Sequence, residues 1–265
     1  MLQQNAKLDL LSLFRPIKSP KIWFHLSYIN TINEYRRTLL GPLWILLSLV
    51  IFTLAVGAVY SGLFSVAYFD YITFMAGGMI AWNWAAAILL SSGMVYLTSA
   101  GIIMDQPVDK AYLIWSHAMS NFIVFLHQIP LFLLFYLVGK APLNSNFLYI
   151  IPSLLIIFLM NIGVAAIFGV LVSRYRDLNK ILGSLVIIIM IVTPIFWKPE
   201  MVTGVRALVY YMNPFYYIVE IIRDPLMGEN PGAFNYLVSS LIAIASLAIG
   251  AVVHKRYSKY VVFWL

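Results

Sequence analysis

Residues 35–44, with the sequence YRRTLLGPLW, open a segment that runs to Leu63 and decides the fold class. Two adjacent arginines and a helix-breaking Gly-Pro pair precede an apolar run long enough to cross a bilayer. The arginines suit a membrane surface, and Pro42 fits the first turn of the helix that follows. The pattern therefore predicts a basic surface element joined directly to a first transmembrane helix.

The composition excludes an ordinary soluble protein. Of the 265 residues, 62% are hydrophobic and 10% are charged, whereas soluble domains carry about 25% charged residues. Because the chain contains no cysteine, a disulfide framework, a thiolate metal site and a cysteine nucleophile are excluded. The polar N-terminal sequence lacks the basic and apolar regions of a cleaved signal peptide, so none is expected. The chain is predicted to be a polytopic membrane protein.

Six apolar runs predict six transmembrane helices in one all-α domain. They cover residues 43–64, 72–98, 114–138, 148–172, 181–197 and 235–253. Most reach the ~20 residues that cross about 30 Å of hydrocarbon. The fifth run is short and carries Pro194 near its end, so this span is expected to stop early or break.

The positions of lysine and arginine predict the orientation. With a cytoplasmic N-terminus, thirteen of the 17 basic residues lie in cytoplasmic segments and four lie in outer ones. This asymmetry follows the positive-inside rule, so both termini are expected in the cytoplasm. The single domain, residues 1–265, would then comprise a cytoplasmic tail and interface helix (1–42), a six-span region (43–253) and a second cytoplasmic tail (254–265).

The segment from Ser19 to Tyr35 is expected to form a helix at the cytoplasmic membrane surface. Ser19 suits the N-cap and Pro20 the first helical position. Apolar side chains recur at helical spacing while polar ones occupy other faces, so the helix is amphipathic and too polar to span. Packing against a soluble partner is an alternative explanation, and the two are compatible.

Two cytoplasmic loops are expected between the spans. Residues 99–113 contain two acids, a proline and one lysine. They are interpreted as a short helical turn that a cytoplasmic partner grasps, or as a plain connecting loop. Residues 173–180 are compact and basic, which topology anchoring alone would explain.

The fifth connection, residues 198–234, lies outside yet contains two apolar, helix-like stretches separated by Asn213 and Pro214. A water-exposed loop rarely holds so many large apolar side chains together. Two short helices that re-enter the outer leaflet are therefore expected over residues 202–211 and 215–227. Glu220, Arg223 and Asp224 share one face of the second helix, where an arginine between two acids lowers the cost of placing charge near lipid.

Four blocks in this order resemble the type 2 ABC exporter permeases of the polysaccharide branch. The blocks are YRRTLLGPLW at 35–44, RYRDL at 174–178, TPIFW at 193–197, and NPFYY at 213–217 with RDPL at 223–226. Together they are specific and extend over residues 35–227. Members closest to this pattern export lipid-linked O-antigen, capsular polysaccharide or teichoic acid.

The resemblance implies a cytoplasmic amphipathic helix, six spans, and re-entrant gate helices between spans five and six. It also implies a dimer of two permeases with two copies of a cytoplasmic ABC ATPase subunit, which bind ATP and Mg. The implied ATPase-coupling interface comprises Tyr35, Arg36, Arg37, Asp105, Gln106, Asp109 and Lys110. The implied gate residues are Asn213, Pro214, Tyr216, Tyr217, Glu220, Arg223 and Asp224, and the basic cytoplasmic loop holds Arg174, Arg176 and Asp177.

No Gly-x₄-Gly-Lys-Ser/Thr stretch occurs in the sequence, so the nucleotide chemistry is expected in a separate polypeptide. No cofactor and no metal are expected in this chain. The expected partners are the ATPase, a second copy of the chain, a lipid-linked polysaccharide and membrane lipids, with no nucleic acid. The inner (cytoplasmic) membrane is the expected location.

Aromatic residues near the span ends are hypothesised to line a conduit on which sugars stack. These residues are Trp44, Tyr60, Trp82, Trp84, Phe196 and Trp197. Aromatic belts at the two membrane interfaces are the alternative explanation for each of them.

The favoured function is the membrane subunit of an ATP-driven exporter of a lipid-linked polysaccharide, with O-antigen ahead of capsule or teichoic acid. A permease of the same superfamily that moves a smaller lipid or drug is the alternative. A membrane transferase ranks low, because it needs clustered carboxylates or histidines near one interface. Asp105 and Asp109 are the one such pair, and no histidine lies near them in the sequence.

Overall fold

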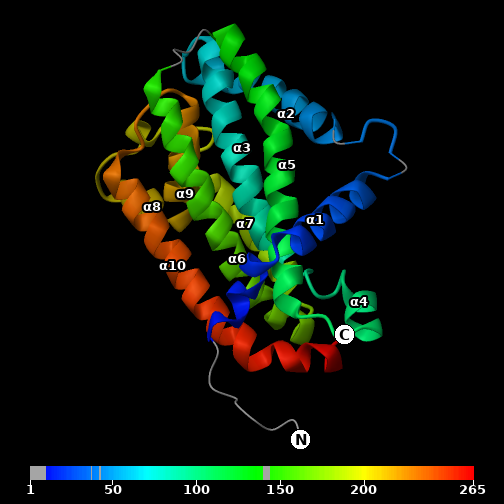
Figure 1. The fold of residues 1–265 in the computed structure, drawn as a ribbon. Helices are drawn as coiled ribbons and strands as arrows, with labels where there is room; N and C mark the ends of the chain where they lie inside the picture. Colours follow the sequence, from blue (N-terminus) through cyan, green and yellow to red (C-terminus); the bar gives the residue numbers. More distant parts are fainter. Residues whose placement is uncertain (1–9, 37, 42, 140–143) are drawn as a thin grey trace, which may run out of the picture.

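The computed structural model describes residues 10–36, 38–41, 43–139 and 144–265, and every regular element in these ranges is helical (Figure 1). The long helices are α2 (Leu43–Leu63), α3 (Tyr68–Ser92), α5 (Lys110–Gly139), α6 (Ile150–Arg174) and α10 (Gly232–Tyr257). The shorter α-helices are α1 (Pro20–Tyr35), α4 (Ala100–Asp105), α7 (Leu178–Val192), α8 (Leu208–Tyr211) and α9 (Pro214–Leu226). Five 3₁₀ segments complete the described part: η1 (Leu10–Lys18), η2 (Ser145–Tyr149), η3 (Pro199–Met201), η4 (Gly204–Ala207) and η5 (Ser258–Phe263).

Five of the six predicted spans have the length and apolarity to cross a membrane, namely α2, α3, α5, η2 with α6, and α10 with η5. The predicted all-helical membrane fold is confirmed at that level. The predicted fifth span, α7, has 15 residues, which rise about 22 Å and fall short of about 30 Å of hydrocarbon. It ends at Val192, two residues before Pro194, so the predicted early end of this apolar helix is confirmed, whereas its crossing of the membrane stays a prediction.

The second span is shorter than its apolar run predicts. The run extends to residue 98, but α3 ends at Ser92 and turns follow until α4. At Gly93 the chain passes so close to α6 that an added Cβ would lie 2.6 Å from Cγ2 of Val172. The apolar run continues past the end of α3 because Val95 and Tyr96 are buried among the N-terminal segment, α5 and α6.

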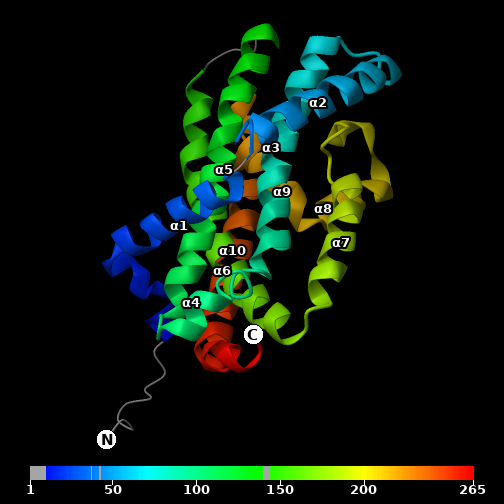
Figure 2. The same ribbon diagram turned by 90° about the vertical axis from the view of Figure 1, so that its right-hand side faces the viewer.

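The helix α3 lies at the centre of the bundle, whereas α2 and α7 lie at its edge. In the most hydrophobic stretch of α3, 78% of the residues are buried, compared with 17% in α2. Figure 2 shows α2 and α7 on one side of the molecule, away from α1. Exposed apolar side chains on α2 and α7, such as Ile51 and Ile188, leave this side open to lipid or to another chain.

The closest helix crossing joins α6 to α10 through glycines. An added Cβ at Gly163 would lie 2.4 Å from the backbone carbon of Ser246, and one at Gly250 would lie 2.7 Å from the carbonyl oxygen of Gly163. Real Cβ atoms do not approach backbone so closely. The two helices can therefore touch backbone to backbone because side chains are absent at these points, as in other helix packings within membranes.

The N-terminal segment before α1 is packed rather than a free tail. Leu13 is fully buried, and its carbonyl accepts a hydrogen bond from Nε1 of Trp115 at 2.8 Å. Trp23 of α1 donates to the carbonyl of Pro16 at 3.0 Å. Ser19 occupies the predicted N-cap position, but its side chain makes no capping hydrogen bond. Packing against α5 therefore positions this segment.

The two buried residues of α1 are polar, and most of its large apolar side chains are exposed together with charged and polar ones. Ser27 and Thr31 are buried toward α5, where Ser120 donates to the carbonyl of Ser27 at 3.3 Å. Ile22 and Ile32, which belong to the predicted apolar face, point away from the rest of the chain. Such a face needs lipid or a partner to cover it.

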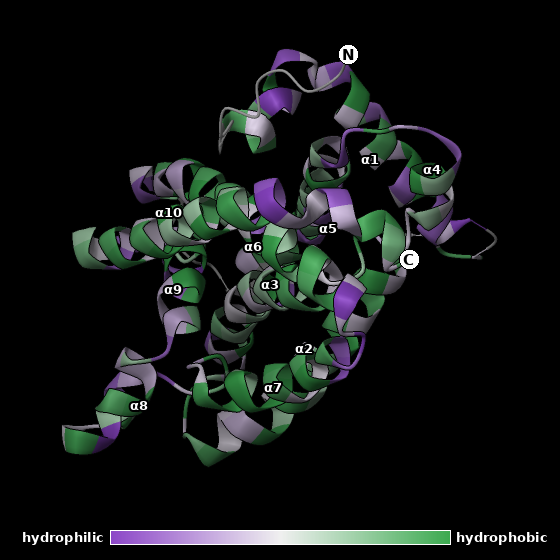
Figure 3. Cartoon of the chain, turned by 90° about the horizontal axis from the view of Figure 1, so that it is seen from below, coloured by the Kyte–Doolittle hydropathy of each residue, from purple (hydrophilic) through white to green (hydrophobic). Residues whose placement is uncertain are grey.

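The segment η1, the C-terminus and α4 lie toward one end of the bundle, and the α2–α3 connection and the end of α5 lie toward the other (Figures 1 and 2). Viewed from the first end, hydrophilic residues gather around α1, α4 and the C-terminus, while α2, α7 and α10 are largely hydrophobic (Figure 3). The helix α9 lies alongside α3 in the half of the bundle farther from the termini (Figure 2). We call this half the outer half.

Candidate functional site

A cavity of about 610 Å³ opens in the outer half between α3, η3, α9 and the first turn of α10. Its lining is polar and charged, with aromatic and thioether side chains among the polar groups. The lining residues are Asp70, Thr73, Phe74, Lys198, Pro199, Glu200, Tyr216, Glu220, Arg223, Asp224, Met227, Glu229 and Asn235. Two of the ionisable side chains, Glu220 and Arg223, are buried, and buried ionisable groups in membrane proteins are rare and usually serve a function.

The Asn213-Pro214 pair fixes where α9 begins. Oδ1 of Asn213 accepts a hydrogen bond from the backbone N–H of Phe215 at 3.0 Å, and Pro214 occupies the first helical turn. Nδ2 of Asn213 donates to Oγ1 of Thr193 at 2.8 Å, which ties the start of α9 to the end of α7. The predicted helix at 215–227 is therefore present as α9, whereas the predicted helix at 202–211 is divided into η4 and α8.

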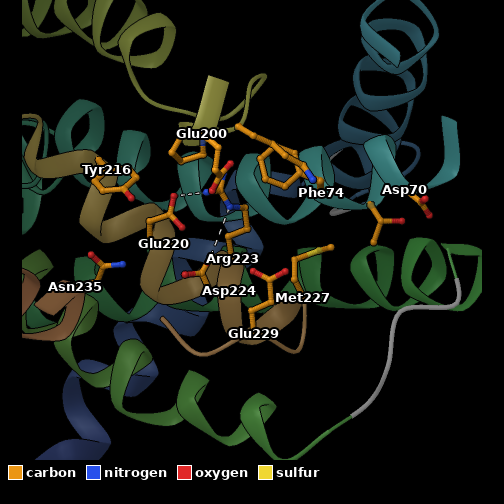
Figure 4. Close-up of a pocket in the computed structure, with 13 residues that line it drawn as sticks. Asp70, Phe74, Glu200, Tyr216, Glu220, Arg223, Asp224, Met227, Glu229 and Asn235 are labelled. Carbon is orange, nitrogen blue, oxygen red and sulfur yellow. Dashed lines mark hydrogen bonds and ion pairs between the residues drawn. The ribbon is translucent and has the colours of Figure 1, made fainter. Parts of the chain in front are cut away.

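Arg223 forms the floor of the cavity and connects three elements (Figure 4). Its guanidinium makes an ion pair with Glu220 and donates to the carbonyl oxygen of Pro194, just after α7. Its Cζ lies 4.4 Å from the centre of the Phe74 ring on α3. The side chains of Arg223 and Glu220 are 3% and 7% exposed, so this ion pair is shielded from water.

Two carboxyl groups flank this single guanidinium, and they differ in how closely they contact it. Glu220 contacts Arg223 directly, whereas Oδ1 of Asp224 lies 3.9 Å from Nε of Arg223. Burial, reinforced by the nearby Glu220, raises the pKa of Asp224 to about 9 despite the neighbouring Arg223. The protonated form of Asp224 is therefore favoured in this buried group beside Glu220 and Arg223.

The remaining predicted gate residues also lie in this region. Tyr216 lines the cavity, and the hydroxyl of Tyr217 donates to the carbonyl of Tyr211 at 2.8 Å. Four tyrosine rings pack against one another in edge-to-face or tilted pairs, with ring centroids 4.4–6.1 Å apart. They belong to Tyr210, Tyr211, Tyr216 and Tyr217. The cluster joins α8 to α9 into one packed unit.

The structure divides the predicted conduit aromatics into two groups. Trp82 and Trp84 are 3% and 1% exposed, and Trp84 stacks on Phe125 at 4.4 Å, so neither can line an open path in this structure. The conduit hypothesis is wrong for these two residues because neighbouring side chains in the chain's own core cover both rings. Tyr60 and Phe196 instead meet at 6.2 Å, Trp44 is half exposed, and Trp197 packs edge-on against Tyr210 at 5.8 Å.

The predicted turn in the loop 99–113 is the helix α4. Its last residue, Asp105, and the following Gln106 are exposed together with Ile102 and Met104. Asp109 is engaged within the chain: it accepts from the backbone N–H of Ala111 at 3.1 Å and lies 3.5 Å from Nη1 of Arg15.

The other half of the predicted coupling interface lies elsewhere. Tyr35 and Arg36 line a cavity of about 400 Å³ together with Ile123 and His127 of α5. These α5 residues lie roughly 20 Å along the helix from Lys110. The expectation that Tyr35 and Arg36 lie beside Asp105 is therefore wrong, because α1 runs along α5 away from α4. Arg37 lies outside the described residues.

The basic loop after α6 contacts the C-terminal segment. The guanidinium of Arg174 lies 5.7 Å from the Trp264 ring centre, and Nη2 of Arg176 donates to the carbonyl of Leu265 at 3.2 Å. Asp177 occupies the N-cap position of α7 without a side-chain hydrogen bond. The loop thus has a packing role at the terminal end of the bundle.

The sequence reasoning missed the cavity residues that lie outside α9, namely Asp70, Phe74, Lys198, Glu200, Glu229 and Asn235. Asp70 offers a signal, because it is an acid at the start of a long apolar helix. The others carry no signal in the sequence, since they meet only when α3, the segment after α7 and α10 pack around α9.

Comparisons with known proteins agree with this architecture. Residues 23–227 match the sequence profile of the family described as "ABC-2 type transporter". The chain is 23% identical over 220 residues to the O-antigen export system permease protein RfbA of Klebsiella pneumoniae, covering 83% of this chain and 84% of that protein. A second Klebsiella pneumoniae protein of the same name is 22% identical over 217 residues, covering 82% and 83% of the two chains. With most of its length matched, this multi-pass membrane protein belongs to the ABC-2 type transporter family.

Proposed function

We propose that the chain is the permease subunit of an ATP-driven exporter that moves a lipid-linked polysaccharide from the cytoplasm across the inner membrane. O-antigen is the first choice of polymer, ahead of capsular polysaccharide and teichoic acid. The observation that carries the proposal is the alignment with two O-antigen export permeases over more than four fifths of the chain. The family match supports transport but does not select the polymer.

In the proposed architecture the terminal end of the bundle faces the cytoplasm, and α7 acts as a short fifth span, which brings the total to six. The helix α1 lies at the cytoplasmic boundary, where its exposed apolar face meets lipid. The helices α8 and α9 re-enter from the outer side. The gathering of α4 and both described chain ends at one end supports this topology.

Two copies of the chain would meet along the side formed by α2 and α7. This side has the least buried span of the bundle, and it carries the aromatic pair Tyr60 and Phe196. A conduit between two such faces offers rings on which sugars can slide, with Trp44 and Trp197 as further candidates. Trp82 and Trp84 belong to the core and have no part in it.

A separate ATPase, in two copies that bind ATP and Mg, would dock on α4. The surface of α4 combines exposed apolar and polar side chains, as transient interfaces do. These side chains are Ile102, Met104, Asp105 and Gln106. Tyr35 and Arg36 are too distant to belong to the same contact patch. If they touch the ATPase, they do so at a second place.

Co-purification tests the proposal. The tagged chain is expressed in its native host, solubilised gently, and assayed for a retained ATPase and for ATP hydrolysis. Asp105→Lys is the informative variant, because Asp105 is exposed and makes no ion pair among the described residues. We expect retained ATPase to fall about fivefold or more, which corresponds to a loss of about 1 kcal/mol.

Arg206→Glu is the matched control, because it reverses an exposed charge on η4, which lies outside α4 and does not line the cavity. Equal losses for the two variants would refute docking on α4. Purification of the chain without any ATPase in several detergents would refute the exporter function itself.

Deletion of the gene should leave the lipid-linked polymer in the cytoplasmic leaflet, and a normal surface polymer in the deletion strain would contradict the substrate assignment.

A further inference from the structure

We propose that the outer cavity binds one unit of a neutral or amino-bearing sugar chain and rejects an anionic chain. The proposal rests on the proposed function and narrows its substrate class. The cavity volume of about 610 Å³ lies within the range of about 300–1,000 Å³ found for small-molecule sites. It is more than a packing defect, because its lining combines groups that accept and donate hydrogen bonds with a ring and a thioether.

The floor of the cavity is held rigidly. Arg223 on α9 is fixed from three directions, by Glu220, by the carbonyl of Pro194 and by the Phe74 ring. A ligand that enters therefore meets charged groups already paired with one another, which cannot reorganise around a new charge without breaking this ion pair. A sugar hydroxyl can share these hydrogen bonds, whereas a phosphate would compete with Glu220 for the guanidinium.

The mouth of the cavity carries carboxylates that have no cation of their own. Asp70, Glu200 and Glu229 are exposed, and no ion pair joins any of them within the described part of the chain. Carboxylate oxygens accept hydrogen bonds from hydroxyl or ammonium groups. Asn235 also lines the cavity; its Nδ2 donates to the carbonyl of Pro231 at 2.8 Å, and its amide oxygen is a further hydrogen-bond acceptor.

The charge balance of the lining sets the selectivity. Glu220 and the three mouth carboxylates are negative, while Lys198 and Arg223 are positive. The excess of negative charge attracts an amino sugar, tolerates a neutral one and repels phosphate or uronate groups, since like charges across an interface suppress the wrong partner. Among the candidate polymers, an O-antigen of neutral or amino sugars therefore fits this cavity better than a teichoic acid.

Ligand-observed NMR on the purified full chain in lipid nanodiscs provides the test. The probes are tetramers of glucosamine (cationic), mannose (neutral) and galacturonate (anionic). The wild type is expected to bind the first two more tightly than the third. In the variant Glu200→Gln with Glu229→Gln, we expect the preference for the cationic over the anionic tetramer to fall about threefold for each carboxylate removed, the size typical of exposed charge pairs.

Two further variants make the result specific. Glu34→Gln removes an exposed carboxylate from α1 and should leave the preference unchanged. Asn235→Phe places a ring in the cavity from the exposed first turn of α10 and should weaken the cationic and neutral tetramers at least about tenfold, as expected when a site is blocked. Its folding is checked by the unfolding midpoint, and Asn235→Leu replaces it if that midpoint falls.

The outcomes separate this proposal from the proposed function. Equal or tighter binding of the galacturonate tetramer would overturn the charge selectivity. If no sugar binds, while the ATPase co-purifies and export depends on this chain, the cavity is not a sugar site. The exporter function would then still be supported. Sugar binding that follows the variants as described, in a chain that retains no ATPase, would support the cavity and overturn the exporter.

Discussion

The buried ion pair in the floor of the outer cavity offers the sharpest test of the structural reasoning. In Arg223→Met, Glu220 stays buried with its partner removed. Both side chains are at most 7% exposed, so solvent does not screen the loss. Removing one member of a buried pair typically costs about 3–5 kcal/mol, because the remaining charge is left in a medium of low dielectric. We expect a loss of this size in the free energy of unfolding.

The double variant Glu220→Gln with Arg223→Met distinguishes this cause from simple loss of packing. It leaves no uncompensated charge, so the remaining cost is the unpaired carbonyl of Pro194 and the lost contact with Phe74. These amount to about 1–2 kcal/mol. The double variant should therefore be more stable than the single variant Arg223→Met by about 2 kcal/mol.

Equilibrium unfolding of the purified chain in mixed micelles, with increasing sodium dodecyl sulfate and helix content as the readout, measures both values. Arg206→Met is the matched control, because Arg206 is exposed on η4 and its loss should change stability by less than about 0.5 kcal/mol. If Arg223→Met is as stable as the double variant, or loses less than about 1 kcal/mol, the buried charge pair does not have the role assigned to it.

Three other expectations follow from contacts in the structure. Gly163→Ala should lower the free energy of unfolding by about 1–3 kcal/mol, because its Cβ would collide with the backbone at Ser246; unchanged stability in the same assay would show that α6 and α10 can separate freely. Trp84→Ala should lower the free energy of unfolding by about 3–5 kcal/mol because it leaves a cavity in the core. Export per folded molecule should be normal, and a reduced export per folded molecule would show that Trp84 lines the conduit after all. Stability should fall as pH rises from about 4 to about 9, because burial and Glu220 raise the pKa of Asp224 to about 9 and the folded chain holds a proton that the unfolded chain releases. Asp224→Asn should flatten this slope, and identical slopes for the variant and the wild type would assign it to other groups.

Much of the architecture follows from local sequence pattern. The apolar runs locate the five long spans to within a few residues at most ends, because hydrophobic length is itself the requirement for crossing a bilayer. Pro194 predicts the early end of α7, and Asn213 with Pro214 predicts the start of α9. Each of these is a property of a few consecutive residues and needs no knowledge of the partners.

The predictions from sequence are wrong where contacts with residues far along the chain determine the structure. The apolar run after Ser92 looks like a continuing span, but Val95 and Tyr96 are apolar because they pack beneath the bundle. Trp84 has the same chemical character as a conduit residue, and its burial by α5 is invisible in the sequence. Tyr35 and Asp105 were grouped by family resemblance, whereas the path of α1 along α5 separates them.

The sequence by itself determined the membrane class, the helical spans, the close grouping of Glu220, Arg223 and Asp224 on one face, and the resemblance to exporter permeases. These are encoded by composition, by the 3.6-residue helical period and by short motifs. The tertiary structure alone decided that residues near positions 70, 198 and 235 enclose a cavity around that face. The physical reason is that a helix fixes the spacing of its own side chains, whereas the groups that meet it from other helices depend on packing between segments far apart in the chain.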